Sequence, residues 1–295
     1  MKQYLAFDIG GTETKYGLIN ERGEIQKSGK FSSQQSDGKH VLKEIKKLTR
    51  LNENDIDGLA ISVPGFVDTV SGFIEYGGAF REFDRFHMKS YLENELEIPV
   101  SVENDVNCVA YSEKWLGNAR NDTDFLCITI GTGIGGALFL NNRLYRGVFN
   151  RAGEFGYMVT QNKENDILDD TLNHTSTMLV LRKKFAAAKN MSLDQVTGIK
   201  VFQAYDAGDE DANRIVTEFY ESISRMIYSL SYIIDPGKIL IGGGISNRPT
   251  FLQELHAQLG QYGINDDIFE VDICYFKNHA GIVGSTYHHM QQKNN

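Results

Sequence analysis

The segment Leu5–Thr14 places one carboxylate, Asp8, immediately before the small-residue turn Gly10-Gly11-Thr12. Backbone N–H groups that no side chain covers bind phosphate oxygens. A carboxylate beside them can hold the Mg²⁺ ion that accompanies a nucleotide. The segment is therefore a candidate phosphate and magnesium site. A glycine turn next to a buried aspartate that its neighbours satisfy is the alternative, because short motifs of this kind are weak signals.

The same pattern returns in the second half of the chain, in Phe125–Asn141. Phe7–Gly10 aligns with Ile128–Gly131, and Asn20 aligns with Asn141 at the same spacing. The repetition predicts one strand–turn–strand unit in each half of the chain. Two such turns, facing each other, could hold one nucleotide from both sides.

Within the second copy, Gly131–Gly136 fits the G-x-G-x-x-G pattern of dinucleotide-binding proteins. That pattern needs a helix directly after the glycines. Ala137–Leu140 followed by Asn141-Asn142 predicts a strand and a turn instead. We therefore do not expect a nucleotide-dependent dehydrogenase.

Asp105 stands where a strand, Val100–Val102, gives way to a helical pattern that ends at Gly117. The N-terminus of a helix stabilises negative charge, so this carboxylate should stay ionised at neutral pH. The alternative is that Asn104 or Asp105 only caps the helix, since both residue types are preferred N-caps.

Two further segments combine glycine with possible binding groups. Glu154 lies between Gly153 and Gly156 and suits a rim that hydrogen-bonds sugar hydroxyls, although an exposed loop charge would look the same. Gly242–Gly244 follow the strand Lys238–Ile241 and precede a helix. Glycines in that position let a planar ring or a phosphate approach the backbone closely.

The elements that must position these residues form an α/β pattern. We expect two domains, residues 1–118 and 119–279, with the polar stretch Ala119–Asp124 as the boundary. A last helix begins near His279, and its His288-His289 pair and Gln291-Gln292 pair are expected to form a solvated tail.

Composition restricts the function classes further. The chain has 295 residues with 41% hydrophobic content, and its formal charge of −9 has the wrong sign for general nucleic-acid binding. It contains no apolar run long enough to span a bilayer and no visible signal peptide, so we expect no membrane partner. Three scattered cysteines argue against a disulfide framework or a cysteine-based zinc site. Together these features predict a cytoplasmic protein.

Five motifs with these properties occur in one order along the chain: Asp8–Thr12, Glu103–Asp105, Ile130–Gly135, Gly153–Gly156 and Ile241–Gly244. The ordered set resembles the ROK family of bacterial sugar kinases over nearly the whole chain. The resemblance implies the two-domain, actin-like (ribonuclease H-like) α/β fold, with a cleft between the domains. It also implies that the helix at about residues 280–295 packs back on the first domain, and that the protein is a homodimer.

The resemblance also implies roles, carried across by position. Asp105 matches the catalytic base, and Asp8 matches the residue that holds Mg²⁺ with ATP. The implied sugar-binding residues are Asn104, Glu154, Gly65, Tyr157 and Asn173. The implied ATP-binding residues are Asp8, Gly10, Gly11, Thr12, Lys15, Thr132, Gly133, Gly242, Gly243 and Gly244.

The chain departs from the family pattern on the sugar side. Tyr157 stands where most members have a histidine, and the cysteine cluster that holds a structural zinc is absent, so no zinc site is expected. Asn173 falls where many members place a second sugar-binding glutamate, and Gly77-Gly78-Ala79 replaces a common asparagine. The anomeric side of the pocket is therefore expected to be altered and roomier. Members that phosphorylate β-glucosides or N-acylmannosamines are more similar to this chain than strict glucokinases are.

These arguments predict an ATP-dependent sugar kinase that phosphorylates a hexose hydroxyl, at C6 of glucose, a β-glucoside or an N-acylmannosamine. The rival hypothesis is a catalytically weak, sugar-binding regulator of the same family. Regulators in this family carry an N-terminal DNA-binding segment, for which we expect no room here because the sequence starts at the first phosphate strand.

Overall fold

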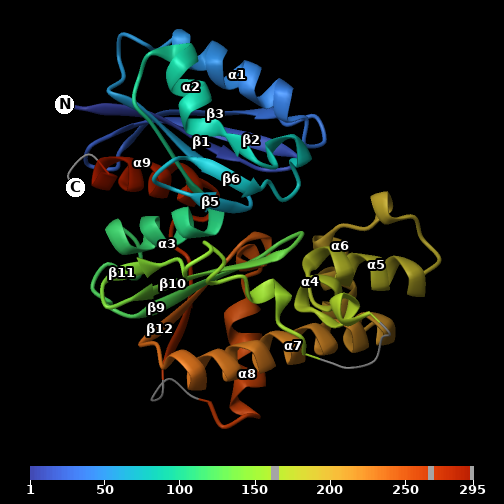
Figure 1. The fold of residues 1–295 in the computed structure, drawn as a ribbon. Coiled ribbons are helices and arrows are strands. Elements are labelled where there is room, and N and C mark those ends of the chain that lie inside the picture. Colours follow the sequence, from blue (N-terminus) through green and yellow to red (C-terminus); the bar gives the residue numbers. More distant parts are fainter. Residues whose placement is uncertain (161–165, 265–268, 293–295) are drawn as a thin grey trace. The chain divides into compact units, whose positions relative to one another are not determined.

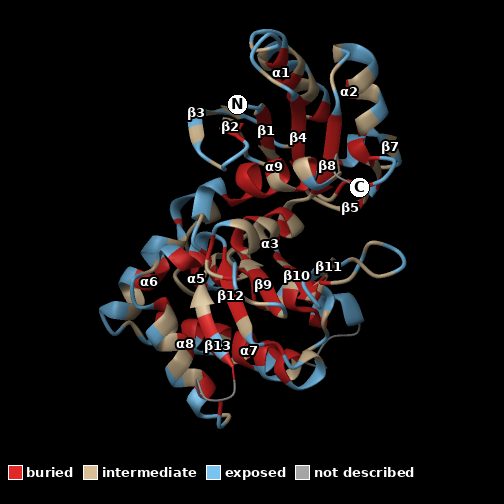
Figure 2. Ribbon diagram, turned by 90° about the vertical axis from the view of Figure 1, so that its left-hand side faces the viewer, coloured by how far each residue is buried: buried red, intermediate tan, exposed pale blue. Residues whose placement is uncertain are grey.

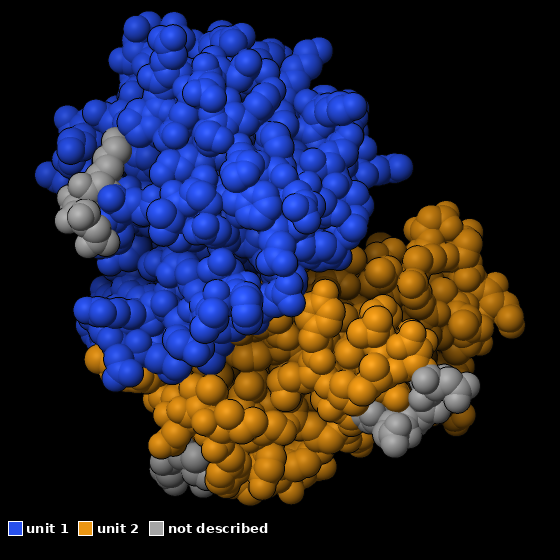
Figure 3. Space-filling view, viewed as in Figure 1, with its two compact units in different colours: residues 1–122, 138–152, 275–295 blue, residues 123–137, 153–274 orange. Residues whose placement is uncertain are grey.

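The computed structural model describes residues 1–160, 166–264 and 269–292. The chain divides into two compact units, coloured separately in Figure 3. The first comprises Met1–Asp122, Leu138–Ala152 and Tyr275–Asn295, and the second comprises Thr123–Ala137 and Gly153–Cys274. The first change of unit falls within the polar stretch predicted as a boundary. Leu138–Ala152 belongs to the first unit although it lies in the second half of the sequence.

The first unit is built on a five-stranded sheet of order β3-β2-β1-β4-β8, whose first three strands are labelled in Figure 1 and all five in Figure 2. The strands β1, β2 and β3 form an antiparallel meander, and β4 and β8 extend the sheet in parallel with β1. Their bounds are Gln3–Ile9 (β1), Glu13–Asn20 (β2), Ile25–Ser32 (β3), Gly58–Val63 (β4) and Val100–Asn104 (β8). The predicted hairpin around Gly10–Thr12 is confirmed.

Alternate residues of these strands face opposite sides of the sheet. One face carries large apolar side chains, such as Phe7, Ile61 and Val102, and packs with buried residues of α1 (Gly38–Arg50) and α2 (Met88–Leu96). The other face carries small side chains, including Ala6 and Ala60, and packs against α9 (Ala280–Gln292). Asp8, Ser62 and Glu103 have the same parity as these alanines within their strands.

Helix α9 crosses α3 (Asp105–Trp115) at backbone contact distance. A Cβ atom added to Gly284 would lie 1.7 Å from the carbonyl oxygen of Cys108, and one added to Gly281 would lie 2.3 Å from the Asp8 carboxyl. Most of α9 is accordingly buried (Figure 2). The last helix belongs to the same unit as the first sheet.

The expectation of a solvated tail at the end of α9 is wrong for His288, His289 and Gln292, whereas Gln291 is exposed. His288 and His289 are buried, and the His289 ring contacts Tyr4 and Ser101 on the sheet. Gln292 donates a hydrogen bond to the carbonyl of Thr69. The cause is tertiary: the small-residue face of the sheet leaves room for two imidazole rings, which a polar sequence pair does not reveal.

A small antiparallel sheet extends the first unit beside the end of β4. It contains β5 (Phe66–Asp68), β6 (Phe73–Tyr76) and β7 (Phe86–His87), in that order. The turn that leads into it requires glycine, because Gly65 has φ +105° and a Cβ there would lie 1.8 Å from the Tyr76 carbonyl oxygen.

The second sheet repeats the topology of the first, with the order β11-β10-β9-β12-β13. Its strands are Phe125–Ile130 (β9), Ile134–Leu140 (β10), Arg143–Tyr145 (β11), Lys238–Gly242 (β12) and Glu270–Ile273 (β13). As in the first sheet, β12 and β13 run parallel to β9. A strand follows the glycines of the second turn, as predicted, and this excludes the helix that the dinucleotide pattern needs.

The second unit also holds five α-helices within its described part. They are Leu172–Thr175 (α4), Met178–Ala188 (α5), Gly198–Asp206 (α6), Glu210–Ile234 (α7) and Phe251–Gly260 (α8). Single-turn 3₁₀ helices occur in the second unit at Phe155–Tyr157, Ile167–Asp170, Leu193–Gln195 and Gly244–Asn247, and in the first unit at Arg81–Phe83 and Lys277–His279. Across residues 1–160, 166–264 and 269–292, no helix combines the length and apolarity needed to cross a membrane.

We predict that Gly284→Ala will lower the free energy of unfolding by about 3 kcal/mol, because the new methyl group overlaps the α3 backbone and the two helices must separate. Denaturant titration measures this change. Gly260→Ala at the end of α8 is the matched control, since a Cβ there has no heavy atom within 4 Å. This variant should not lower the free energy of unfolding. Equal stability of the two variants would contradict the backbone contact.

Candidate active site

The turn after β1 presents Asp8 beside exposed backbone. Ser62 on the neighbouring strand β4 donates a hydrogen bond of 2.8 Å to Asp8 Oδ1, and Lys15 Nζ lies 3.9 Å from Oδ2. Gly10 N–H closes the hairpin onto the Glu13 carbonyl, and Thr12 is exposed at the tip. The predicted phosphate residues of the first hairpin therefore gather at one end of β1 and β2.

Burial raises the pKa of the Asp8 carboxyl above its ordinary value, although Ser62 and Lys15 act in the opposite direction. The carboxylate keeps 22% of its side-chain surface exposed, so a cation could reach it. Within the described ranges, no group of three or more His, Cys, Asp or Glu side chains is arranged to hold a metal. One carboxylate still suits Mg²⁺, which keeps several waters and is bound largely through substrate phosphates.

Asn104 and Asp105 lie at the junction of β8 and α3. Asn104 caps α3, because its Oδ1 accepts the backbone N–H groups of Val106 at 2.9 Å and Asn107 at 3.0 Å. Its Nδ2 also donates to the Gly65 carbonyl at 3.0 Å. The capping alternative thus holds for Asn104, which in addition fixes the Gly65 turn. Asp105 is the first residue of the helix and is half-buried.

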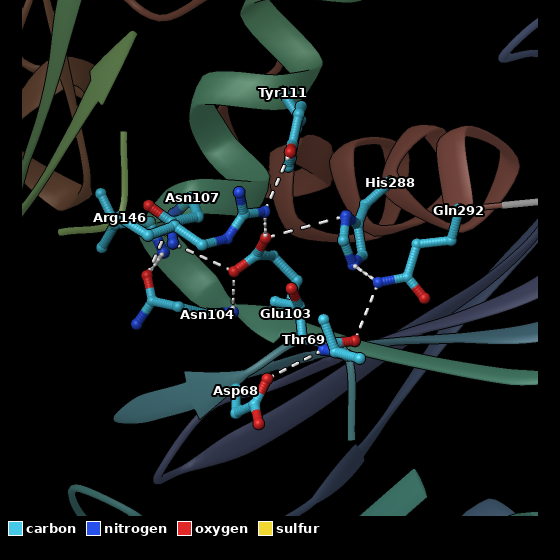
Figure 4. Close-up of polar contacts among 11 residues, drawn as sticks. Asp68, Thr69, Glu103, Asn104, Asn107, Tyr111, Arg146, His288 and Gln292 are labelled. Carbon is cyan, nitrogen blue, oxygen red and sulfur yellow. Dashed lines mark hydrogen bonds and ion pairs between the residues drawn. The ribbon is translucent and has the colours of Figure 1, made fainter. Parts of the chain in front are cut away.

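Behind this junction lies a charged cluster that the sequence analysis did not identify (Figure 4). Glu103 is fully buried and is paired with the guanidinium group of Arg146. Tyr111 and His288 complete the cluster. The only sequence signal was Glu103 itself, a carboxylate that follows the buried valines of the same strand; nothing in the sequence pointed to Arg146 or His288.

In the second unit, the β9–β10 turn meets the glycines that follow β12. Gly243 has φ +85°, and a Cβ there would lie 2.4 Å from the Ile130 carbonyl oxygen, so only glycine allows this approach. The Gly131 carbonyl accepts the N–H of Met178, which opens α5. Thr132 and Gly244 are left open on the same side.

These two turns border a cavity of about 600 Å³ that lies within the second unit. Its size is within the range of small-ligand pockets. Arg248 forms ion pairs with Asp206 and Glu254, and its guanidinium group lies 4.5 Å from the centre of the Phe202 ring. The cavity is lined by Gly131, Thr132, Met178, Arg182, Thr197, Gly198, Ile199, Phe202, Gln203, Asp206, Gly244, Ile245, Asn247, Arg248 and Pro249. Of the predicted nucleotide residues, Thr132 and Gly244 line it directly.

The remaining predicted sugar ligands also lie in the second unit. Glu154 precedes the turn Phe155–Tyr157, and burial raises the pKa of its carboxyl. Tyr157 is 48% exposed. Asn173 Oδ1 accepts the N–H of Ile134 at 2.8 Å, so this side chain supports the second turn. A sugar contact for Asn173 remains a prediction.

The comparisons with known proteins agree with these features. The family model of the ROK family matches residues 4–291. A β-glucoside kinase of Listeria monocytogenes is 46% identical over 292 residues, which cover 98% of each chain. A solved L. monocytogenes structure, described as a candidate N-acetylmannosamine kinase, is 44% identical, with a TM-score of 0.95 and coverage of 99% of this chain and 100% of that one.

A ROK glucokinase of Streptomyces griseus, solved with glucose and AMPPNP, gives a TM-score of 0.83 at 23% identity and covers 98% of this chain and 99% of that one. At that identity the likeness shows the fold alone. The fold is the two-domain actin-like ATPase fold that the sequence resemblance implied.

We predict that Asp8→Asn will stabilise the ligand-free protein at pH 7. A carboxyl with a raised pKa binds its proton more readily in the folded state, so folded-state stability is lost as pH rises above about 3.9, the unfolded value. The asparagine keeps the Ser62 contact without the charge. Thermal unfolding should show a higher midpoint at pH 7, and this gain should vanish below pH 4.

Asp68→Asn is the control with the opposite sign, because its hydrogen bond from Ser71 lowers the pKa of the Asp68 carboxyl. That variant should be less stable than the parent protein at pH 7. A destabilised Asp8→Asn protein would show that the carboxylate is satisfied in the folded state rather than held at a cost.

Proposed function

The chain belongs to the ROK family and is a sugar kinase, and we propose that it transfers the γ-phosphoryl group of ATP to the 6-hydroxyl of a β-glucoside. The observation that carries the choice of sugar is 46% identity with a β-glucoside kinase across 98% of both chains. Two further β-glucoside kinases, at 45% and 43% identity, support the same substrate class. The regulator hypothesis is not favoured, because these relatives are named as kinases.

The residues around Gly65 support a substrate larger than glucose. Gly77 and Gly78 replace a side chain that many family members have, and Ala79 is exposed beside them. The Gly77 N–H is held by Asp84 at 2.9 Å, and a Cβ at Gly77 would lie 2.3 Å from the Phe80 carbonyl oxygen, so this position is already closed by its own loop. We therefore place a substituent on the anomeric oxygen beside the exposed Ala79.

In the proposed reaction, Asp105 accepts the proton of the sugar hydroxyl while the oxygen of that hydroxyl forms a bond to the γ-phosphorus. The bond from the γ-phosphorus to the bridging oxygen breaks, and ADP leaves with that electron pair. Phosphoryl transfer depends mainly on positioning and charge neutralisation, so the protein needs one base and well-placed N–H donors. Asn104, Gly65 and Glu154 are the proposed sugar ligands, with Tyr157 and Asn173 on the altered side.

The chain offers suitable groups for ATP and Mg²⁺. The cavity of the second unit has apolar walls at Met178, Ile199 and Phe202 that suit a purine ring. We assign the phosphates to the turns Gly10–Thr12 and Thr132–Gly133, with Lys15 as a neighbouring cation. Asp8 would hold the Mg²⁺ ion, which supplies charge neutralisation for the phosphates. We also propose that the protein is a homodimer and that it acts in the cytoplasm. Membership of the ROK family supports both statements.

Asp105→Asn is predicted to lower kcat by about 10²- to 10⁴-fold, because the amide cannot take the proton. The asparagine oxygen can still accept the Val106 N–H that Asp105 accepts at 2.9 Å, so the helix start should persist. Steady-state kinetics measure kcat, and calorimetry should show unchanged sugar binding. Asp55→Asn, in an exposed turn, is the control and should behave like the parent protein. Normal turnover by Asp105→Asn would exclude this residue as the base.

A substrate screen tests the function itself. The protein is incubated with ATP, Mg²⁺ and, separately, cellobiose, an aryl β-glucoside, glucose and N-acetylmannosamine, with ADP release and product mass as readouts. We expect the highest kcat/KM for a β-glucoside and a product heavier by one phosphoryl group. Preference for glucose or N-acetylmannosamine would refute the substrate assignment, and sugar binding without turnover would favour the regulator.

A further inference from the structure

The charged cluster behind α3 is not used by the reaction as proposed, yet it is built around the residue next to the sugar ligand Asn104. Glu103 has no exposed side-chain surface. A buried carboxylate is costly unless it is paired and hydrogen-bonded. Each of its two oxygens has partners, and these partners come from three separate parts of the first unit.

The first oxygen of Glu103 holds the start of α3. Oε1 accepts the backbone N–H of Asn104 at 2.8 Å and the side-chain amide of Asn107 at 3.0 Å. Asn107 is one turn into the helix, and its own N–H is capped by Asn104. Asp105 lies between these two anchored residues, so its backbone is fixed on both sides by groups bound to a single carboxylate oxygen.

The second oxygen reaches Arg146, which follows β11. The guanidinium group pairs with Glu103 Oε2 and donates to the Tyr111 hydroxyl on α3 at 2.9 Å. Burial alone would lower the pKa of Arg146, but the carboxylate of Glu103 and the hydroxyl of Tyr111 raise it above its ordinary value. The Arg146 carbonyl accepts the N–H of Ala152 at 3.1 Å, which closes the loop that leads in sequence to Glu154.

A third arm comes from α9 (Figure 4). His288 Nδ1 lies 3.7 Å from Glu103 Oε2, and its Nε2 lies 3.1 Å from the Gln292 amide nitrogen. Because an amide nitrogen can only donate, Nε2 accepts and Nδ1 carries the proton that faces Glu103. Gln292 also donates to the Thr69 carbonyl at 2.8 Å. This arm places the end of β5, whose strand starts beside Gly65, next to the same carboxylate.

We propose that Glu103 and Arg146 are positioning residues for phosphoryl transfer. Their ion pair fixes the first turn of α3, so that Asp105 meets the sugar hydroxyl with its carboxyl already in place, and Arg146 links that turn to the loop before Glu154. The inference rests on the proposed role of Asp105. A displacement of about 1 Å at a reacting group can cost about 10²-fold in rate. A buried ion pair that holds the first turn of α3 in place can therefore preserve the rate, although burying its charges costs stability.

Glu103→Gln and the double variant Glu103→Gln with Arg146→Met test the proposal. Both keep an oxygen for the Asn104 and Asn107 hydrogen bonds, and the double variant leaves no unpaired buried charge. We expect kcat to fall by about 10- to 100-fold in both, with KM for sugar and ATP within about threefold. The double variant should recover thermal stability without recovering kcat. Recovery of both would overturn the proposal, because the pair would then only stabilise the fold.

Glu113→Gln is the matched control. Glu113 is equally buried, lies at the other end of α3, and accepts the N–H groups of Tyr275 and Asn118. This variant should lose stability and keep its kcat when assayed well below its unfolding temperature. An equal loss of kcat in Glu113→Gln and Glu103→Gln would refute a specific positioning role.

Hydrogen exchange gives a readout that does not depend on turnover. In Glu103→Gln, amides of residues 104–108 should exchange faster than in the parent protein, whereas Glu113→Gln should affect the amides of Tyr275, Phe276 and Asn118 instead. Unchanged exchange at 104–108 would overturn the proposal. A parent protein that turns over no sugar would refute the proposed function separately, and the exchange result would still decide whether Glu103 anchors the helix start.

Discussion

The close packing of α9 on one face of the first sheet is the constraint on which the first unit depends. Gly281 and Gly284 have no side chain to separate α9 from Asp8 and from the backbone of α3. The face of the sheet that packs against α9 carries small residues, Ala6 and Ala60 among them. Close-packed interiors do not tolerate added volume, so the two glycines determine how closely α9 can lie to α3 at Cys108 and to Asp8.

This face also explains why buried charges occur where they do. Asp8 and Glu103 replace small or apolar side chains at the ends of β1 and β8, where their strands leave the core. Each charge is compensated differently: Asp8 by Ser62 and Lys15 with part of its surface open, and Glu103 by a closed set of partners. The partly exposed carboxylate of Asp8 suits ligand binding, and the buried carboxylate of Glu103 suits holding the start of α3 in place.

The two sheets use one topology for two purposes. By the alignment of the repeats, Thr129 occupies the place of Asp8 in the second copy, so the second sheet lacks the strand carboxylate. The second unit has a cavity instead, bordered by the β9–β10 turn and by the glycines after β12. The first copy thus has a carboxylate beside its turn, whereas the turn of the second copy borders a cavity.

The sequence by itself determined the duplicated hairpins, the strand-to-helix position of Asp105 and the glycine turns at Gly65 and Gly243 that end two strands. All of these depend on local periodicity, turn chemistry and residue size, which act over a few neighbours. Tertiary structure alone decided the burial of His288 and His289, the pairing of Glu103 with Arg146 and the walls of the cavity around Phe202 and Arg248. Those contacts join segments that are distant along the chain, and their partners are chosen by packing against a common surface, which no local pattern encodes.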